Sequence, residues 1–455
     1  MSQGTDHDGP AQASLSPLGR WLSRASPSAV TFYAALAAFA AYASMYAFRK
    51  PFTATDYNSV PDLVLFGYAF SYKPIAIISQ LLGYLLSKFL GIRFASSAQY
   101  RQRAPFVLAL ILFAEVALFF FGMVPAPWNL VLLFLNGIPL GMVWSMLFGL
   151  LEGRRNTEFL SLGMSVSVIF SSGWVRSVGR LVMHKWQVPE FWMPAVTGAL
   201  FIPLLLVSLY MLQQLPAPDK DDMRERSARR PMSRSDRKRF VRTYLPGIVC
   251  LVFGYLLLMA YRNVRDDFMG GILQDLGHTV APEDFANTEN FVGLSVIAVL
   301  CCLRLVKNNR QAVWVNLGLV AAGALLLGGS TALLQAEMLS PINFYVLNGI
   351  GLYVAFVPYQ SILMDRLIAT LPTLATASFL IALGDSYGYL SVVGVYLGRD
   401  IYQTTTGTQL PWASLLVSLS YAVTILVPLA MIGNFVYFRR KMDSGAGSQV
   451  EGGPN

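Results

Sequence analysis

The chain has 455 residues, of which 55% are hydrophobic and 13% are charged, about half of the ~25% charged fraction usual in soluble domains. This composition excludes an ordinary soluble enzyme. The formal net charge of +9 raises the question of nucleic-acid binding, which the position of the charges answers below.

Residues 1–27 are polar and rich in Ser, Pro and Gly, and no small-residue cleavage site follows, so the first apolar stretch is expected to remain as a span. No ten-residue alternation typical of membrane β-strands occurs, so the spans are predicted to be helices. Apolar windows of about 19 residues predict an all-α integral membrane protein with twelve transmembrane helices, near 28–50, 66–90, 105–124, 127–151, 158–182, 190–213, 244–263, 288–307, 312–335, 340–363, 373–397 and 411–438.

Most of the 34 Lys and Arg residues fall on connections that share one side of the membrane if the N-terminus is inside. This bias predicts that both termini lie in the cytoplasm of a protein in the cell membrane. The basic segment 219–242 mixes both signs, which is typical of a solvated linker near anionic lipid headgroups rather than of a nucleic-acid site. The stretch from Asp266 to Glu289 is acidic and is expected to be an outer loop.

An internal repeat divides the chain. Leu135-Asn136-Gly137-Ile138 recurs as Leu347-Asn348-Gly349-Ile350 at an offset of 212 residues, and Arg49 corresponds to Arg262 at an offset of 213. We therefore predict two pseudo-symmetric six-helix bundles in parallel orientation, an arrangement that many transporters use. The predicted parts are a cytoplasmic segment 1–27, bundles 28–213 and 244–441, a basic linker 214–243 and a cytoplasmic tail 442–455.

This architecture resembles the major facilitator superfamily over nearly the whole chain. Within it, Tyr46-Ala-Phe-Arg49-Lys50-Pro-Phe52 is similar to the first-helix signature of the organophosphate:phosphate antiporters, and Tyr84-x-x-Ser87-Lys88-Phe89 is similar to their second-helix motif. On the seventh helix, Tyr255, Arg262 and Asp267 resemble a third motif with a longer spacing. The resemblance implies that Arg49 and Arg262 face each other across a cavity and bind phosphate.

The sequence also departs from that family. The antiporters carry a histidine on helix five, whereas His7, His184 and His278 all lie outside the predicted spans. The loop after the second span keeps the outline of the superfamily's motif, but Ser87 stands in place of the acid. An outlying branch of the superfamily with another organic anion as substrate is therefore an open alternative.

Ionisable side chains within a membrane are costly, by about 2.5–3.5 kcal/mol each on insertion scales, and they default to functional roles. Lys73 and Arg176 join Arg49 and Arg262 in the outer halves of predicted helices one, two, five and seven. Such cations would hold an anion, and the planar guanidinium fork suits carboxylate or phosphate oxygens. The alternative is that some of them extend to the outer headgroups, as is expected for Lys50 and Arg180.

Two acids lie deep in the predicted spans. Asp385, on helix eleven, would either pair with Arg176 or Arg262 or carry a proton. Glu115, on helix three, would bind a coupling proton or make an interhelical hydrogen bond. At the cytoplasmic end, Lys88 and Glu152 are predicted to form a gate.

Uncharged polar residues complete the predicted substrate site. Hydroxyl and amide groups on predicted helices one, two, four, ten and eleven could orient a substrate. For the two repeated asparagines, close helix packing with an interhelical hydrogen bond is an equal alternative. The candidates are Tyr46, Gln80, Asn136, Asn348, Tyr353, Gln360 and Tyr387.

The sequence thus predicts a secondary transporter that moves a small organic anion, which could be phosphorylated, by alternating access. Exchange against phosphate and symport with protons both stay open. A non-transporting sensor for such an anion is the alternative, and an integral-membrane enzyme is disfavoured because no HExxH or GxSxG motif occurs. No cofactor or metal is expected, since Cys250, Cys301 and Cys302 lie in apolar stretches without CxxC spacing.

Overall fold

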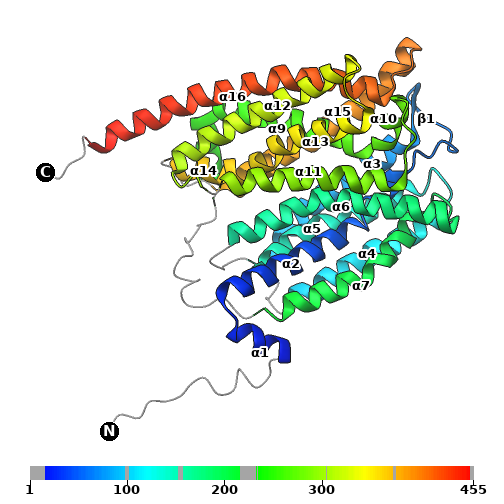
Figure 1. The fold of residues 1–455 in the computed structure, drawn as a ribbon, viewed down its shortest axis with the longest axis horizontal. Helices are drawn as coiled ribbons and strands as arrows, with labels where there is room; N and C mark the ends of the chain where they lie inside the picture. The colour runs from blue at the N-terminus through cyan, green and yellow to red at the C-terminus, as the bar shows by residue number, and fades with distance from the viewer. Residues whose placement is uncertain are drawn as a thin grey trace, which may run out of the picture.

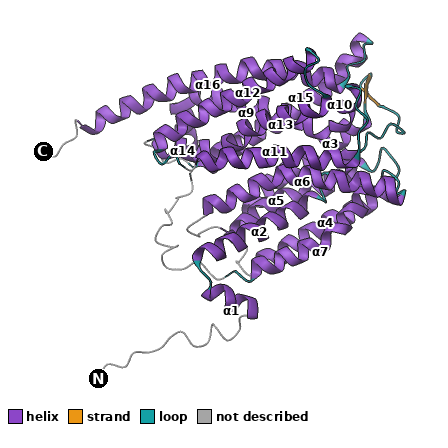
Figure 2. Ribbon diagram, in the orientation of Figure 1, coloured by secondary structure: helices purple, strands orange, loops and turns teal. Residues whose placement is uncertain are grey.

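The computed structural model describes residues 16–97, 102–151, 157–215, 232, 234–303, 305–371 and 376–450. Long helices run side by side in two groups, and both chain termini lie at the same end of them (Figure 1). Apart from one short hairpin, the described elements are helical (Figure 2). We call the end that carries the hairpin and α10, opposite to the termini, the hairpin end.

The first bundle begins with helices whose starts are set by local chemistry. Ser26 accepts a hydrogen bond from the backbone of Ala29, and Pro27 occupies the first helical position, where its missing N–H costs nothing. Within the bundle, α3 and α4 pack on α5, while α2 packs on α6 and α7. The elements are α1 (Pro17–Arg24), α2 (Pro27–Tyr46), η1 (Pro51–Ala54), β1 (Leu63–Leu65), β2 (Tyr68–Phe70), α3 (Tyr72–Ser97), α4 (Arg103–Met123), α5 (Leu130–Leu151), α6 (Thr157–Trp186) and α7 (Met193–Gln213).

The second bundle repeats this packing scheme. Its helix α12 packs on α13 and α16, and α9 packs on α15 and α16. A one-turn π-helix follows α13 directly, so the predicted span 340–363 is continuous in space but changes its winding at residue 359. The elements are α9 (Arg234–Asp267), α10 (Met269–Asp275), α11 (Pro282–Leu303), α12 (Asn309–Gln335), α13 (Pro341–Pro358), η3 (Tyr359–Leu363), α14 (Met364–Thr370), α15 (Ala377–Thr406) and α16 (Trp412–Val450).

Ten of the described helices are long and apolar enough to cross a membrane. The helices α3 and α6, with 26 and 30 residues, occupy the second and fifth predicted spans. Large apolar side chains such as Leu112, Phe113 and Val116 on α4 are exposed, as expected for a surface that faces lipid. The prediction of twelve membrane helices in two six-helix bundles is confirmed.

The start of the second predicted span is wrong. Residues 66–71 are not helical, because β1 and β2 form an antiparallel hairpin before α3 begins. Its two turn residues, Phe66 and Gly67, have φ values of 54° and 84°, and consecutive positive φ values are what a tight hairpin turn requires. The hairpin is bonded to the second bundle: the backbone N–H of Ser71 donates to Asp400 at 3.0 Å, and that of Ala69 donates to Thr404 at 3.2 Å.

The bundles meet along a surface that we call the seam, formed by α6 against α11 and by α3 and β2 against α15. Two glycines allow the close approach of α6 and α11. A Cβ atom on Gly173 would lie 2.8 Å from the Cβ of Glu289, and one on Gly293 would lie 2.6 Å from the Phe170 ring. Real Cβ atoms do not come so close, so any side chain at either position would push the bundles apart.

Candidate functional site

Arg49 lies in the turn that follows α2, and it is 8% exposed. Its guanidinium carbon stands 4.4 Å from the ring centre of Tyr84 and 5.8 Å from that of Tyr46. Among the described residues, no acceptor lies within hydrogen-bond or ion-pair distance of this guanidinium. Arg49 is therefore a nearly buried cation whose partners among the described residues are aromatic rings.

Arg262 lies on α9 and is also 8% exposed. Its Nε stands 3.6 Å from a carboxylate oxygen of Asp266, an ion pair one turn along the same helix. The guanidinium carbon lies 4.9 Å from the ring centre of Phe356. The 3.6 Å between Nε and Asp266 is too long for a hydrogen bond, and Nε has no other partner in the described part of the chain. Arg262 therefore has an unused hydrogen-bond donor.

The two arginines lie around the same pair of tyrosines. Tyr46 of the first bundle and Tyr389 of the second each interact electrostatically with Arg49 and with Arg262. The rings of Tyr84 and Tyr389 meet across the seam with their centres 5.6 Å apart. The structure thus brings together Arg49, Arg262 and Tyr46, three of the residues singled out from the sequence.

Arg176 joins the bundles directly. It is fully buried on α6, and its Nε donates to the Ser172 carbonyl at 2.8 Å. One terminal nitrogen donates to the backbone carbonyl of Asp266 in the second bundle, while the other has no partner among the described residues. Arg176 is therefore engaged in holding the seam closed, although it retains one free donor.

Lys73, at the start of α3, is 4% exposed. Its ammonium group donates to Asp56 at 2.7 Å and lies 5.0 Å from the ring centre of Phe268. Asp56 belongs to the loop before the hairpin, so Lys73 already has a carboxylate partner within its own bundle. A substrate that needed this cation would have to compete with Asp56.

The expectation that Lys50 reaches the headgroups is wrong. Lys50 is 5% exposed and forms an ion pair with Asp267 across the seam. The other oxygen of Asp267 accepts a hydrogen bond from Tyr396 at 2.9 Å. Neighbouring helices cover Lys50 because α9 continues to Asp267 and brings its carboxylate to the end of α2.

Arg265 and Glu289 are buried residues that sequence reasoning missed. Arg265 is fully buried and pairs with Glu289 at 2.9 Å and with Asp266 at 3.2 Å. It also donates to the Tyr345 carbonyl at 3.0 Å, which ties α9 to α11 and α13. Residues 266–289 were expected to be an acidic outer loop, but Asp266 and Asp267 end α9 and Glu289 lies within α11.

The two deep acids have different surroundings. Asp385 accepts a hydrogen bond from Tyr255 at 2.6 Å, while the cations expected to pair with it, Arg176 and Arg262, both contact Asp266. Glu115 packs against Gly198 of α7, where an added Cβ would lie 3.1 Å from the Glu115 carboxyl carbon. One Glu115 oxygen is buried without a partner among the described residues.

The repeated asparagines are both buried and hydrogen-bonded within their own bundles. Asn136 donates to the carbonyls of Phe48 and Ala114 at 3.1 and 3.0 Å, and accepts from Gln80 at 2.8 Å. Asn348 accepts from Tyr261 at 3.0 Å and donates to Ser330 at 3.4 Å. Each asparagine therefore connects several helices, as the packing alternative describes.

Among the remaining predicted site residues, Tyr387 does not join the arginine pair. Tyr387 is 51% exposed, on a different face of α15 from Asp385. Glu152 lies outside the described residues, and so does the side chain of Lys88, so the predicted cytoplasmic gate cannot be located. In the part of the chain that the structure describes, no three His, Cys, Asp or Glu side chains are grouped so as to hold a metal ion.

Buried charges around the arginine pair do not balance. The pairs Lys73–Asp56 and Arg399–Asp400 are each neutral. The other buried charges of the described residues carry one formal positive charge in excess, since Arg49, Lys50, Arg176, Arg262 and Arg265 stand against Asp266, Asp267, Glu289 and Asp385.

Residues 51–441 match the model of a family described as a family of unknown function, DUF5690. The chain belongs to this family. Among curated proteins, none matches the sequence.

Solved structures of transporters share the fold. A D-xylose–proton symporter superposes with a TM-score of 0.64 at 14% identity, covering 88% of this chain and 96% of its own. The nucleoside transporter NupG gives 0.60 at 10% identity, covering 90% and 100%. The xylose transporter XylE from E. coli, in a partially occluded inward-open conformation, gives 0.59 at 12% identity, covering 89% and 97%.

These similarities identify the fold as that of the major facilitator superfamily, and the chain as a multi-pass membrane protein. The narrower likeness to organophosphate antiporters gains no support from them, because the matched proteins are named for a sugar and for nucleosides. It stays a prediction from the sequence motifs.

Proposed function

We propose that this protein is a secondary transporter that carries a small organic anion across the cell membrane by alternating access. Bundles 28–213 and 244–441 would rock around the arginine pair, with the hairpin end outside and both termini in the cytoplasm. The fold shared with sugar and nucleoside transporters supports transport, and the position of the basic residues supports this orientation.

The surroundings of Arg49 are the observation that supports an anionic substrate. Buried charges in proteins are normally paired, because removing an ion from water costs several kcal/mol. Arg49 is 8% exposed and has only aromatic rings as partners among the described residues. A bound carboxylate or phosphate would supply the missing counter-charge, and its oxygens match the guanidinium fork.

The charge balance supports the same substrate class. Among the described residues, five buried cations stand against four acids, so one bound negative charge would balance this set. Arg262 would contribute its unused Nε, and Tyr46, which interacts with both arginines, would offer a hydroxyl. A neutral sugar would leave Arg49 buried and unpaired.

The seam contacts support an alternating mechanism. Lys50–Asp267 and the bond from Arg176 to the Asp266 carbonyl join the bundles at the hairpin end. Opening that end would break both. An anion that drew Arg262 away from Asp266 would weaken the same network, so the proposal links substrate binding to opening of the hairpin end. This coupling of binding to opening is compatible with exchange against phosphate and with symport of protons.

Thermal stabilisation of the purified protein tests the proposal. A panel of carboxylates, organic phosphates and neutral sugars is compared on wild type, Arg49→Gln and the control Arg24→Gln, which removes an exposed arginine of α1. A ligand at 100 times its Kd stabilises by about 2.7 kcal/mol. We expect one anion class to stabilise wild type and Arg24→Gln but not Arg49→Gln.

Uptake of the identified anion into proteoliposomes then separates a transporter from a sensor, since both would bind but only a transporter would accumulate radiolabel. Stabilisation by neutral sugars that Arg49→Gln retains would contradict the anion proposal. Binding without uptake would contradict transport.

A further inference from the structure

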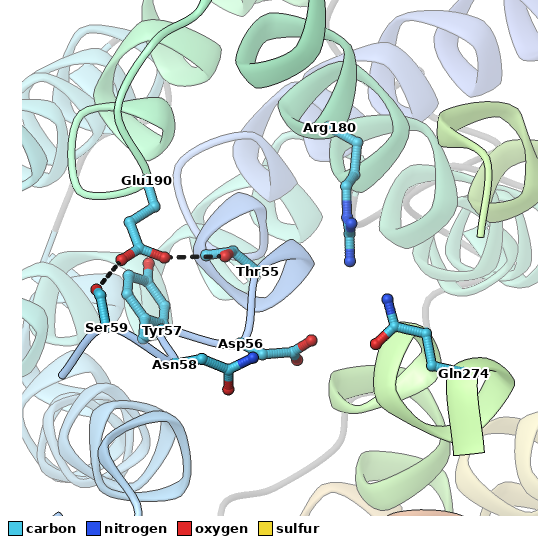
Figure 3. Close-up of a pocket in the computed structure, with 8 residues that line it drawn as sticks. All are labelled: Thr55, Asp56, Tyr57, Asn58, Ser59, Arg180, Glu190 and Gln274. Carbon is cyan, nitrogen blue, oxygen red and sulfur yellow. Dashed lines mark hydrogen bonds between the residues drawn. The ribbon is translucent and has the colours of Figure 1, made fainter. Parts of the chain in front are cut away.

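A polar pocket of about 290 Å³ lies at the hairpin end, and neither arginine of the pair lines it. Figure 3 shows its walls: the loop after η1, the end of α6, the loop before α7, and α10 of the second bundle. It opens to solvent and is large enough for a small metabolite. Its lining residues are Thr55, Asp56, Tyr57, Asn58, Ser59, Arg180, Glu190 and Gln274.

One wall is held rigidly by Glu190. Its carboxylate accepts hydrogen bonds from Thr55 at 3.2 Å and from Ser59 at 2.5 Å, as Figure 3 shows. Between them, the ring of Tyr57 is buried against Tyr72, with centres 5.2 Å apart. The loop 55–59 is thus preformed, which lowers the entropic cost of binding a ligand.

The cation of this cavity is Arg180. Its Nε donates to the Ala54 carbonyl at 2.7 Å, and its guanidinium lies 5.6 Å from the ring centre of Phe285. No described residue accepts a hydrogen bond from the two terminal nitrogens, and the group points into the space between Asp56 and Gln274 (Figure 3). A Cβ on Gly270 would lie 2.9 Å from one of those nitrogens, so the glycine leaves room for this orientation.

The anion of the cavity is Asp56. One of its oxygens accepts from Lys73 at 2.7 Å, and the other accepts no hydrogen bond from a described residue. Burial on its own would raise the pKa of Asp56, but Lys73 and, more weakly, Arg180 bring that pKa below its ordinary value. Asp56 is therefore ionised at neutral pH and offers a free acceptor opposite the free donors of Arg180.

We propose that this cavity is a binding site for a small carboxylate that carries a hydroxyl or ammonium group beside the carboxylate. The carboxylate would lie on the terminal nitrogens of Arg180 and the amide of Gln274. The hydroxyl or ammonium would donate to the free oxygen of Asp56. A carboxylate without such a donor would meet Asp56 and Glu190 with no compensating bond, so the site selects for the donor group.

The site is separate from the arginine pair, because the two share no residue. It also spans the seam: Gln274 belongs to the second bundle, and the other seven residues belong to the first. A ligand that touches both sides binds better when the hairpin end is closed, and it therefore favours that arrangement.

Lactate and propionate form a matched pair of probes, since they differ in one hydroxyl group. Binding to the full-length protein in lipid nanodiscs is measured by saturation-transfer NMR titration. A hydrogen bond to a charged group is worth about 1.5–3 kcal/mol, so we expect lactate to bind at least about tenfold more tightly than propionate. Equal binding of the two probes, or no saturable binding of lactate, overturns the proposal.

Variants locate the site. Arg180→Gln should abolish lactate binding, and Asp56→Asn should reduce it to the level of propionate. Gln274→Leu, at an exposed position of α10, should weaken it as well. The control Lys185→Gln removes an exposed cation from the same end of α6 and should leave binding unchanged.

The pattern of losses separates the two proposals. If lactate binding survives both Arg180→Gln and Gln274→Leu but is lost in Arg49→Gln, the anion site is the arginine pair alone, and the cavity proposal is wrong. If it is lost in Arg180→Gln and kept in Arg49→Gln, the cavity is a second site, whatever the outcome of the transport assay.

Discussion

The two bundles carry the same residues at equivalent positions but surround them differently. Arg49 in the first bundle has no acidic partner among the described residues, whereas its counterpart Arg262 pairs with Asp266 at 3.6 Å. The second bundle also holds Asp267 and Glu289, both buried. The repeat therefore supplies a pair of arginines, and the second bundle alone supplies buried acids close to them.

The repeated Asn-Gly step shows the same divergence. In the first bundle, a Cβ on Gly137 would lie 2.9 Å from the backbone nitrogen of Tyr84, so the glycine allows α3 and α5 to approach closely. In the second, a Cβ on Gly349 would lie 2.9 Å from the guanidinium carbon of Arg265. The same glycine serves backbone packing in one bundle and makes room for a buried cation in the other.

This difference suggests a division of labour. In the proposed transporter, the first bundle would offer Arg49 to the substrate. The second bundle pairs Arg262 with Asp266 and extends Asp267 to Lys50 across the seam. Three sets of variants test this interpretation.

The largest effect is expected at the ion pair across the seam. Lys50→Met leaves the fully buried Asp267 side chain with Tyr396 as its remaining partner among the described residues. Removing one member of a buried pair costs about 3–5 kcal/mol. The double variant Lys50→Met, Asp267→Leu should recover most of that loss. Unfolding of all three proteins in nanodiscs measures the coupling; a double variant that is less stable than Lys50→Met would show that the pair is not the relevant contact.

The arginine pair should respond asymmetrically. Arg49→Gln removes an unpaired buried cation, so ligand-free stability should be unchanged or higher, while the ligand response of about 2.7 kcal/mol at 100 times Kd disappears. Arg262→Gln takes a partner from Asp266 and should cost about 1–3 kcal/mol of ligand-free stability. Thermal unfolding with and without the anion separates the two; equal ligand-free losses would contradict the division between bundles.

An effect no larger than that of Arg262→Gln is expected at the repeated glycines. Gly137→Ala places a methyl group against rigid backbone of α3, and such overpacking costs about 1–3 kcal/mol. Gly349→Ala meets the side chains of Arg265 and Val292, which can shift, so its cost should be lower. Unfolding of the two alanine variants checks the order, and a reversed order would mean that Arg265 is less mobile than its contacts suggest.

Hydropathy was sufficient to predict the twelve spans, because a helix that crosses lipid needs an apolar stretch of defined length. It could not predict the hairpin, since Leu63–Phe70 is as apolar as a span and only the positive φ at Phe66 and Gly67 separates it from α3. The short α10 was missed as well, because its 7 residues are too few to produce an apolar window.

The arginine pair could be predicted because the repeat marks equivalent positions. The acids near it could not, because Asp266 and Asp267 follow the apolar window and look like the start of a loop. One pattern could have predicted that α9 continues to these acids. Arg265 and Asp266 follow Arg262 by three and four residues, which puts all three on one helical face. The Lys50–Asp267 pair depends on how two bundles meet, which no local pattern encodes.

The hairpin is a suitable position for a probe of the motion of the two bundles. Its base is bonded to Asp400 and Thr404 of the other bundle, yet the side chain at its tip, Phe66, is 98% exposed. An environment-sensitive fluorophore attached at position 66 would contact little of the protein at rest. When the bundles separate at that end and the hairpin is released, the change in its surroundings would turn a rearrangement of helices into an optical signal.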